Sequence, residues 1–244
     1  MHESERRTVL QRSFRRMIRH VRPPVATQHP APDAAFSTLK IISWNLLRLT
    51  GATPEDVARL IGRYRPDILL MQEATASIDS LAEQVGGSYW RTPMPGRIHG
   101  LALWSPHPLP DPPMVLPLPA GSLFERVCQV VELDGVGIAN VHLSHGQVLN
   151  RRQLRRIARV LPARAAVLGD YNLVGPALLP GFEDVGPRHP THVMAEIMPL
   201  RIDRCLVREL TCLHAAVLPR RRSDHRPIVV TLEAAAVPVL MQAA

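Results

Sequence analysis

From residue 38 onward, short apolar runs alternate with amphipathic segments and polar turns. The runs in the first half are rich in β-branched residues and too short for helices, so they predict buried strands. These predicted strands cover residues 39–45, 66–73 and 100–105. Apolar side chains recur at helical spacing in two segments between them, which predicts helices at 53–64 and 77–87.

The first predicted helix has clear start signals. Thr53 is placed to act as N-cap, Pro54 stands at the first helical position, and two acidic residues follow in the first turn. Its predicted buried face consists of Val57, Leu60, Ile61 and Tyr64. The helix predicted at 77–87 ends at a pair of glycines.

The second half of the chain is richer in predicted strands. Residues 126–133 and 136–144 are joined through Asp134-Gly135, a pair typical of hairpins. A helix is predicted at 147–162, with an inward face of Val148, Leu154, Ile157, Ala158 and Leu161. Four further strands are predicted at 165–170, 201–207, 212–218 and 225–233. Hairpins mixed with crossover helices indicate a layered α and β architecture.

Residues 1–37 differ from this body in composition. Residues 8–22 have an amphipathic helical pattern with arginines around the polar face. Residues 23–37 are rich in Pro and Ala and lack periodicity, which predicts a linker. We therefore place a domain boundary near Ser37, a folded domain over 38–235 and a short tail over 236–244.

The formal net charge of +8 is unevenly distributed. Residues 1–22 carry seven arginines against two glutamates, a net charge of +5, whereas the remaining residues carry 22 basic and 19 acidic side chains. A basic amphipathic extension suits nucleic acid or an anionic membrane surface. A solvated extension without a dedicated partner explains the same composition equally well.

The cysteines and the lengths of the apolar runs indicate in which cellular compartment the protein is expected. The 244-residue chain has three cysteines without CxxC spacing, which predicts neither a disulfide framework nor a zinc site. No apolar run approaches the ~20 residues of a membrane span, and the N-terminus lacks the apolar core of a secretion signal. We expect a cytoplasmic monomer, and leave open a peripheral location at a membrane.

Side chains that carry chemistry gather at the ends of the predicted strands. Two carboxamides, four carboxylates and two histidines follow or interrupt apolar runs: Asn45, Glu73, His142, Asp170, Asn172, Asp203, Asp224 and His225. Most have an ordinary explanation when taken singly, such as a turn cap or a solvated carboxylate. Asp203 is harder to explain in this way, because a carboxylate in a buried strand needs a partner, which His142 or His225 could supply.

Taken together, these residues favour one chemistry. Oxygen-rich ligands without sulfur suit hard cations such as Mg²⁺ or Mn²⁺. A histidine held by a carboxylate exchanges a proton near neutral pH, and a second histidine with an amide stabilises charge on a phosphoryl oxygen. These groups predict hydrolysis of a phosphate ester.

Six segments in fixed order, SWN, QE, NVHL, GDYN, RID and SDHRP, resemble the endonuclease/exonuclease/phosphatase superfamily. That superfamily includes apurinic endonucleases, deoxyribonucleases, bacterial sphingomyelinases and inositol polyphosphate 5-phosphatases. The resemblance covers about residues 38–233. It implies an α+β fold, a four-layer α/β/β/α sandwich of two mixed β-sheets with outer helices. The active site would lie where strand ends of both sheets meet.

The resemblance also implies a metal site for Mg²⁺ or Mn²⁺. Glu73 of QE would be the principal metal ligand. Asn45 of SWN would be a ligand or a near neighbour of the metal, and Asp224 of SDHRP would be a further carboxylate on the metal side.

The remaining matched residues would act on water and phosphate. Asp170 and Asn172 of GDYN would position both groups. His225 would be the catalytic histidine, oriented by Asp203 of RID, and His142 of NVHL would be a second histidine that stabilises the phosphate. Whether Asp170 or His225 accepts the proton of the attacking water is left open.

We therefore expect a divalent-metal-dependent phosphodiesterase, with nucleic acid, a phospholipid or a small molecule as substrate. An aromatic content of 4% provides few platforms for base stacking, whereas the basic N-terminus suits a lipid surface. The chain departs from the superfamily at Pro106, where members often have arginine after the preceding serine. The alternative function is a catalytically degenerate binding or scaffold module of the same fold.

Overall fold

The computed structural model describes residues 38–121, 125–195 and 197–234. The amphipathic segment 8–22, the linker 23–37 and the tail 236–244 lie outside the described residues, so the expectations for them stay predictions. Among the helices that are described, none is long and apolar enough to cross a membrane.

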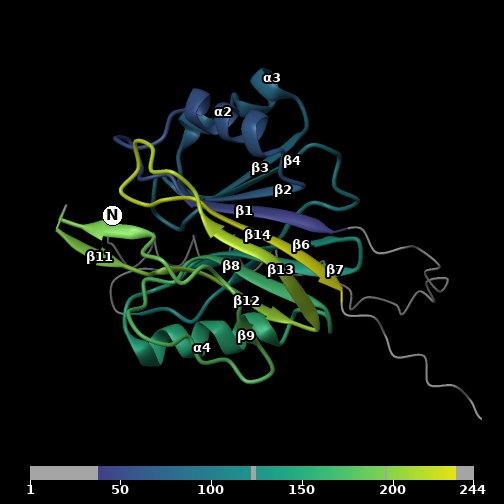
Figure 1. Cartoon of the computed structure of the whole chain (residues 1–244), viewed down its shortest axis with the longest axis vertical. Coiled ribbons are helices and arrows are strands. Elements are labelled where there is room, and N and C mark those ends of the chain that lie inside the picture. Colours follow the sequence, from purple (N-terminus) through teal and green to yellow (C-terminus); the bar gives the residue numbers. More distant parts are fainter. Residues whose placement is uncertain (1–37, 122–124, 196, 235–244) are drawn as a thin grey trace, which may run out of the picture. The chain divides into compact units, whose positions relative to one another are not determined.

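Two mixed six-stranded sheets form the centre of the molecule (Figure 1). The first sheet has the order β13-β14-β1-β2-β4-β3. Its strands are β1 (Leu39–Asn45), β2 (Ile68–Ala74), β3 (Ser88–Pro93), β4 (Gly100–Ser105), β13 (Leu210–Val217) and β14 (Ile228–Ala234). Only β1 and β2 pair in parallel among these described strands; their neighbours pair antiparallel.

The second sheet has the order β5-β6-β7-β8-β12-β9. Its strands are β5 (Met114–Pro117), β6 (Val127–Leu133), β7 (Val136–His142), β8 (Ala165–Asp170), β9 (Glu183–Asp184) and β12 (Asp203–Arg208). Here β7 and β8 are the parallel pair. A separate hairpin of β10 (His192–Met194) and β11 (Met198–Leu200) precedes β12.

Helices cover the outer faces of both sheets, which confirms the expected four-layer sandwich. The helices α2 (Pro54–Tyr64) and α3 (Leu81–Val85) pack on the first sheet, with the short 3-10 turn η1 (Ala76–Ile78) between them, and α4 (Gln147–Ala158) packs on the second (Figure 1). A third apolar cluster, which includes Ile41, Leu70, Ile138, Leu168 and Val230, fills the space between the sheets.

A polar network also joins the two sheets. Asn140 of β7 is completely buried, and its Nδ2 donates to the carbonyl oxygens of Met71 and Ala102, in β2 and β4 of the other sheet, at 3.2 and 2.9 Å. Its Oδ1 accepts from Nε2 of Gln72 at 2.8 Å. Because each buried amide needs partners in specific positions, these contacts specify how one sheet lies on the other.

Helix α2 begins as expected. The side chain of Thr53 accepts from the backbone N–H of Asp56, and the Asp56 carboxylate accepts from that of Thr53, which makes a capping box. The Asp134-Gly135 hairpin is also confirmed, because both residues have positive φ, +50° and +73°, as a type I′ turn requires.

Two helix predictions were wrong in detail. The helix predicted at 77–87 is divided into η1 and the five-residue α3, which ends at Gly86. In α4, Val148 does not face inward and is 75% exposed, whereas the polar residues Asn150 and Gln153 are completely buried. The side-chain amide of Gln153 accepts from N of Ser144 and donates to O of Pro119, both at 2.9 Å. The buried Gln153 thus provides hydrogen-bond partners for backbone groups of two loops.

Candidate active site

Strand register brings three of the predicted residues together in the second sheet. His142 ends β7, Asp170 ends the parallel neighbour β8, and Asp203 begins β12. In the ladder, Asp170 stands opposite His142 on one side and opposite Asp203 on the other. In the facing sheet, Asn45 ends β1 next to Gln72 of β2. Residues far apart in the chain therefore meet at one end of the sandwich.

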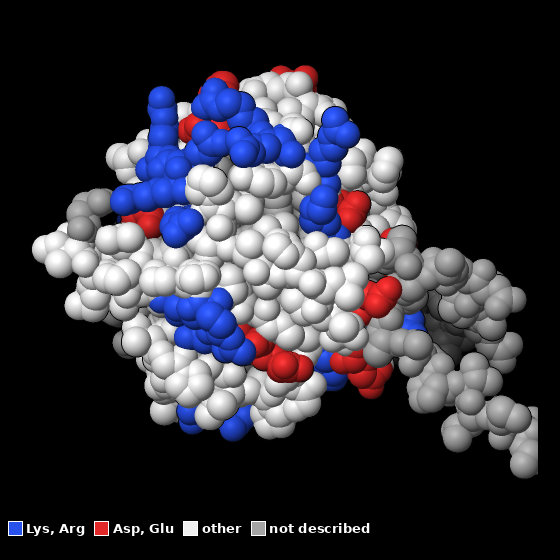
Figure 2. All heavy atoms as spheres, viewed as in Figure 1, with Lys and Arg blue, Asp and Glu red and all other residues white. Residues whose placement is uncertain are grey.

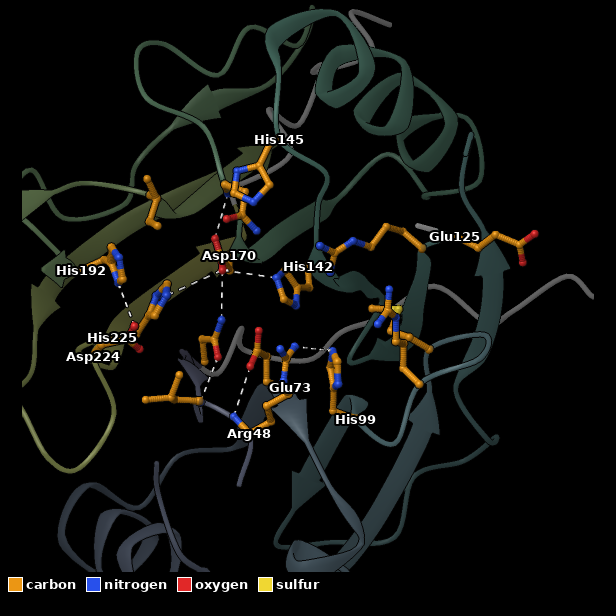
Figure 3. Close-up of a pocket in the computed structure, with 17 residues that line it drawn as sticks. Arg48, Glu73, His99, Glu125, His142, His145, Asp170, His192, Asp224 and His225 are labelled. Atoms are coloured by element: carbon orange, nitrogen blue, oxygen red, sulfur yellow. Dashed lines mark hydrogen bonds and ion pairs between the residues drawn. The ribbon is translucent and has the colours of Figure 1, made fainter. Parts of the chain in front are cut away.

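A pocket of about 300 Å³ lies at this end. Seven of the eight predicted residues line it: Asn45, Glu73, His142, Asp170, Asn172, Asp224 and His225 (Figure 3). The eighth, Asp203, does not line the pocket but lies behind His225.

His225 and Asp203 form a buried ion pair. Nδ1 of His225 lies 2.9 Å from Oδ2 of Asp203, and both side chains are nearly inaccessible to solvent. Burial alone would lower the pKa of His225, but the carboxylates of Asp203 and Asp170 outweigh it and raise that pKa to about 10. The imidazole is therefore protonated at neutral pH, with Nε2 directed toward Asp170, 3.8 Å from its Oδ2.

Asp170 is the centre of the site (Figure 3). Its Oδ2 accepts from Nδ2 of Asn45 at 3.0 Å, and its Oδ1 accepts from the backbone N–H of Asn172 at 2.8 Å. Burial raises the pKa of this carboxyl to about 6, with the charge of His225 opposing the rise. The carboxylate is therefore ionised at pH 7 and is a better proton acceptor than an ordinary aspartate.

His142 completes this side of the pocket. Its Nε2 lies 3.5 Å from Oδ2 of Asp170, and no described residue forms a hydrogen bond with its Nδ1. Burial, followed by the positive charge of Arg126, places the pKa of His142 well below its usual value. His142 is therefore neutral and has one ring nitrogen left for another partner.

Glu73 lies in strained backbone at the opposite wall. Its φ is +55°, in the left-handed region that non-glycine residues rarely adopt, and the β2–β4 register shifts between Met71 and Ala74. This irregularity places the Glu73 carboxylate in the pocket, where Oε2 accepts from the backbone N–H of Arg48 at 3.1 Å. Strained residues of this kind concentrate at functional sites.

The oxygen donors that line the pocket fit a hard divalent cation. Glu73 offers a half-exposed carboxylate, and the side chains of Asn45 and Asp170 line the same pocket. Oxygen ligands of this type are those that Mg²⁺ and Mn²⁺ take in proteins. None of the described lining residues is a cysteine.

Comparison with known proteins identifies the family. The model of the endonuclease/exonuclease/phosphatase family matches residues 42–225. The chain belongs to this family. A comparison with curated proteins found no match.

Solved structures of this family share the fold. An endonuclease/exonuclease/phosphatase family protein from Bacteroides vulgatus is 17% identical, with a TM-score of 0.68, covering 82% of this chain and all of the other. One from Beutenbergia cavernae is 20% identical, with a TM-score of 0.64 and coverage of 83% and 73%. TDP2 of D. rerio, in complex with a single-strand DNA product, is 18% identical, with a TM-score of 0.61 and coverage of 80% and 99%.

The loop that carries Asp224 and His225 in this endonuclease/exonuclease/phosphatase family protein is tied to β1. Oγ of Ser223 donates to O of Asn45 at 2.7 Å and accepts from N of His225 at 3.0 Å. Nε1 of Trp44 donates to O of His225 at 3.0 Å. These hydrogen bonds fix the SWN and SDH segments relative to each other, and with them the positions of Asn45, Asp224 and His225 at the pocket.

Asp224 lies with histidines and not beside Glu73 (Figure 3). Its Oδ2 is 3.7 Å from Nδ1 of His192, and the ligand atoms of His192, Asp224 and His225 lie within 4.8 Å of one another. The His192 ring also lies 4.4 Å from the His225 ring, centroid to centroid. The predicted role of Asp224 on the metal side therefore stays a prediction.

Several pocket residues were missed by the sequence reasoning. They are Arg48, Arg97, His99, Glu125, Arg126, His145 and His192. His192 begins β10, and the others lie in loops or just before strands, whereas the sequence prediction rested on polar residues at the ends of apolar runs. Arg48, which comes three residues after Asn45, was the easiest to find from its position.

Proposed function

We propose that the protein is a divalent-metal-dependent phosphodiesterase. Family membership supports phosphate-ester hydrolysis in general, and the contacts of Asp170 support the specific assignment. This buried carboxylate lies between a protonated histidine, a neutral histidine and a carboxamide. A phosphate bound there would meet a proton acceptor and hydrogen-bond donors at once.

Mg²⁺ or Mn²⁺ would be held mainly by Glu73, with Asn45 and Asp224 as the further predicted metal-side residues. When bound, the ion supplies Lewis-acid stabilisation of phosphate charge. The backbone N–H of Arg48 orients the Glu73 carboxylate through its contact with Oε2. The bulge at Glu73 holds that carboxylate at the pocket wall.

The charge states favour Asp170 over His225 as the group that accepts the proton. His225 is protonated at neutral pH because of Asp203, so Nε2 is a donor there, whereas Asp170 is ionised. In the proposed reaction, water attacks phosphorus, its proton passes to Asp170, and the ester bond breaks, so that the leaving oxygen departs as an anion and takes a proton from solvent. His225 and Asn172 would donate hydrogen bonds to the phosphoryl oxygens, and neutral His142 would donate one from the single ring nitrogen that carries its proton.

The substrate class has two main candidates. D. rerio TDP2 was solved with a single-strand DNA product, which makes a nucleic acid one candidate. A phospholipid or small phosphodiester is the other. Arginines on the face shown in Figure 2 gather over α2 and the loop before β14, but Arg59 and Arg222 there both contact Asp56 and are therefore partly neutralised.

The test is a panel of chromogenic and natural esters assayed with Mg²⁺, with Mn²⁺ and with EDTA. The panel contains bis-p-nitrophenyl phosphate, p-nitrophenyl phosphate, single-stranded DNA and phospholipid vesicles. We expect hydrolysis of a diester that EDTA abolishes and added metal restores. If a folded protein hydrolyses none of these esters with either metal, the proposal is wrong and a binding module of the same fold is favoured.

A further inference from the structure

Arg126 carries a buried charge that the proposed chemistry does not use. The residue precedes β6, lines the pocket and is only 9% exposed. No described residue accepts a hydrogen bond from its Nε. Buried cations are costly unless they are paired, so the position calls for an anion.

The nearby carboxylates do not pair directly with the Arg126 guanidinium. Glu73 and Asp170 attract the guanidinium of Arg126 through space, but neither forms a hydrogen bond or ion pair with it in the described chain. A cation held by Glu73 would cancel much of this attraction. With a metal bound, the positive charge of Arg126 would therefore be even less compensated.

Two further arginines extend this positive region. Arg48 approaches Nε2 of His99 with Nη1, at 3.4 Å, and lines the pocket next to Glu73. Arg97 lies in the tight loop between β3 and β4, which is closed by hydrogen bonds from N of Arg97 to O of Met94 and from N of Met94 to O of His99. Arg48 and Arg97 are exposed, so they are accessible to a ligand.

Burial lowers the pKa of Arg126, and the charges of Arg97 and Arg48 lower it further, so the three guanidinium groups lie near one another. In Figure 3, His192, Asp224 and His225 lie on one side of Asp170, Arg48 lies next to Glu73, and His99 lies beyond them on the other side. Glu125, the acidic residue next to Arg126, directs its carboxylate away from the other labelled side chains. An anion on this side would therefore meet the guanidinium of Arg126, whose Nε has no hydrogen-bond partner among the described residues.

We propose that Arg48, Arg97 and Arg126 form a second anion subsite, which binds a further phosphate group of the substrate. This inference rests on the proposed function, in which the first phosphate is hydrolysed beside Asp170. The substrate is then a phosphodiester that carries another phosphate near the scissile one. A polynucleotide strand and a multiply phosphorylated small molecule share this chemistry.

Binding without turnover tests the subsite. Ca²⁺ replaces Mg²⁺, and calorimetry on the full chain compares thymidine 3′,5′-bisphosphate with thymidine 5′-monophosphate. A second pair, glucose 1,6-bisphosphate and glucose 6-phosphate, has the same difference without a nucleoside. We expect the bisphosphate to bind at least about tenfold more tightly in the nucleotide pair, as one charge-assisted contact allows. A preference in both pairs extends the subsite to small molecules.

Arginine variants test which residues cause the preference for the bisphosphate over the monophosphate. Arg97→Gln and Arg126→Gln should each lower the bisphosphate-to-monophosphate affinity ratio by about tenfold, to near one. Arg155→Gln, on the exposed side of α4, removes the same charge elsewhere and should keep the wild-type ratio. If Arg126→Gln does not fold, exposed Arg97 decides the result.

Two outcomes would overturn the subsite. One is equal wild-type affinity for both members of the nucleotide pair, and the other is a preference that survives in the folded arginine variants. Because the measurement needs no hydrolysis, it remains informative if every esterase assay fails. Conversely, metal-dependent hydrolysis without a bisphosphate preference would leave the proposed function standing and remove only the subsite.

Discussion

The substitution Asp203→Asn removes the negative charge 2.9 Å from Nδ1 of His225, where the two side chains are only 2% and 7% exposed. Burial lowers the pKa of His225, yet Asp203 and Asp170 raise it to about 10, above the ordinary value of 6.5. Because the folded-state pKa is the higher one, the stabilising contribution is complete below pH 6.5 and is lost as the pH rises through 10.

The magnitude follows from this difference. One pKa unit corresponds to about 1.4 kcal/mol, which limits the contribution to the order of 5 kcal/mol, and breaking a buried ion pair costs about 3–5 kcal/mol. We therefore expect Asp203→Asn to lower the free energy of unfolding of the metal-free protein by about 3–5 kcal/mol at pH 6. The deficit should shrink by roughly 1 kcal/mol per pH unit toward pH 9.

Urea unfolding of wild type and variant at pH 6, 7.5 and 9 measures this deficit. Asp134→Asn is the control, because the hairpin turn at this position favours asparagine and Asp134 has no buried histidine partner in the described chain. A deficit below about 1 kcal/mol at pH 6, or one of constant size across the pH range, would refute the assigned charge state of His225.

Three further predictions address the metal, the pH dependence and the core. Glu73→Gln should reduce metal-dependent turnover at least about a thousandfold without lowering Tm. The control Glu83→Gln, at an exposed residue of α3, should leave turnover unchanged. Comparable turnover in both variants would contradict the metal assignment. Because burial raises the pKa of Asp170, kcat should fall as the pH drops through about 6, and a profile flat down to pH 4.5 would contradict this. Asn140→Ala should lower the free energy of unfolding by about 2–4 kcal/mol, because buried polar groups of both sheets, Gln72 and Gln129 among them, each lose a hydrogen bond. Chemical denaturation that gives less than about 1 kcal/mol would contradict the bridging role.

The parts of the fold that sequence predicted well are those with local signals. The Thr53 cap and the Asp134-Gly135 turn need only neighbouring residues to form, and both were confirmed. Val148 was assigned wrongly because periodicity treats apolar residues as inward, whereas α4 buries Asn150 and Gln153 to satisfy loop carbonyls and amides. That requirement comes from tertiary structure and leaves no trace in the helix pattern.

Irregular strands were missed for a similar reason. Strand β3 is half exposed along its length, so it lacks the continuous apolar run that marked β4 beside it. Strand β5 lies in a proline-rich segment that resembles a loop in sequence. Edge strands need few buried residues, so their patterns are weak.

In the candidate site, too, sequence predicted some residues, and only the three-dimensional structure revealed others. Residues at strand ends, such as Asp170, could be predicted because strands in one sheet share an edge. The partner of Asp203 was left open between two histidines, and only the three-dimensional arrangement selects His225. Arg126 could not be found, because its burial, and the absence of a hydrogen-bond partner for its Nε among the described residues, depend on tertiary structure.

The most direct test of the central claim is kcat/KM for bis-p-nitrophenyl phosphate at saturating Mg²⁺, compared between wild type and folded Asp170→Asn. If Asp170 accepts the proton of the attacking water, the variant should lose a factor of roughly 10²–10⁴ while keeping its unfolding midpoint within a few degrees. Turnover by Asp170→Asn at the wild-type rate would contradict the account.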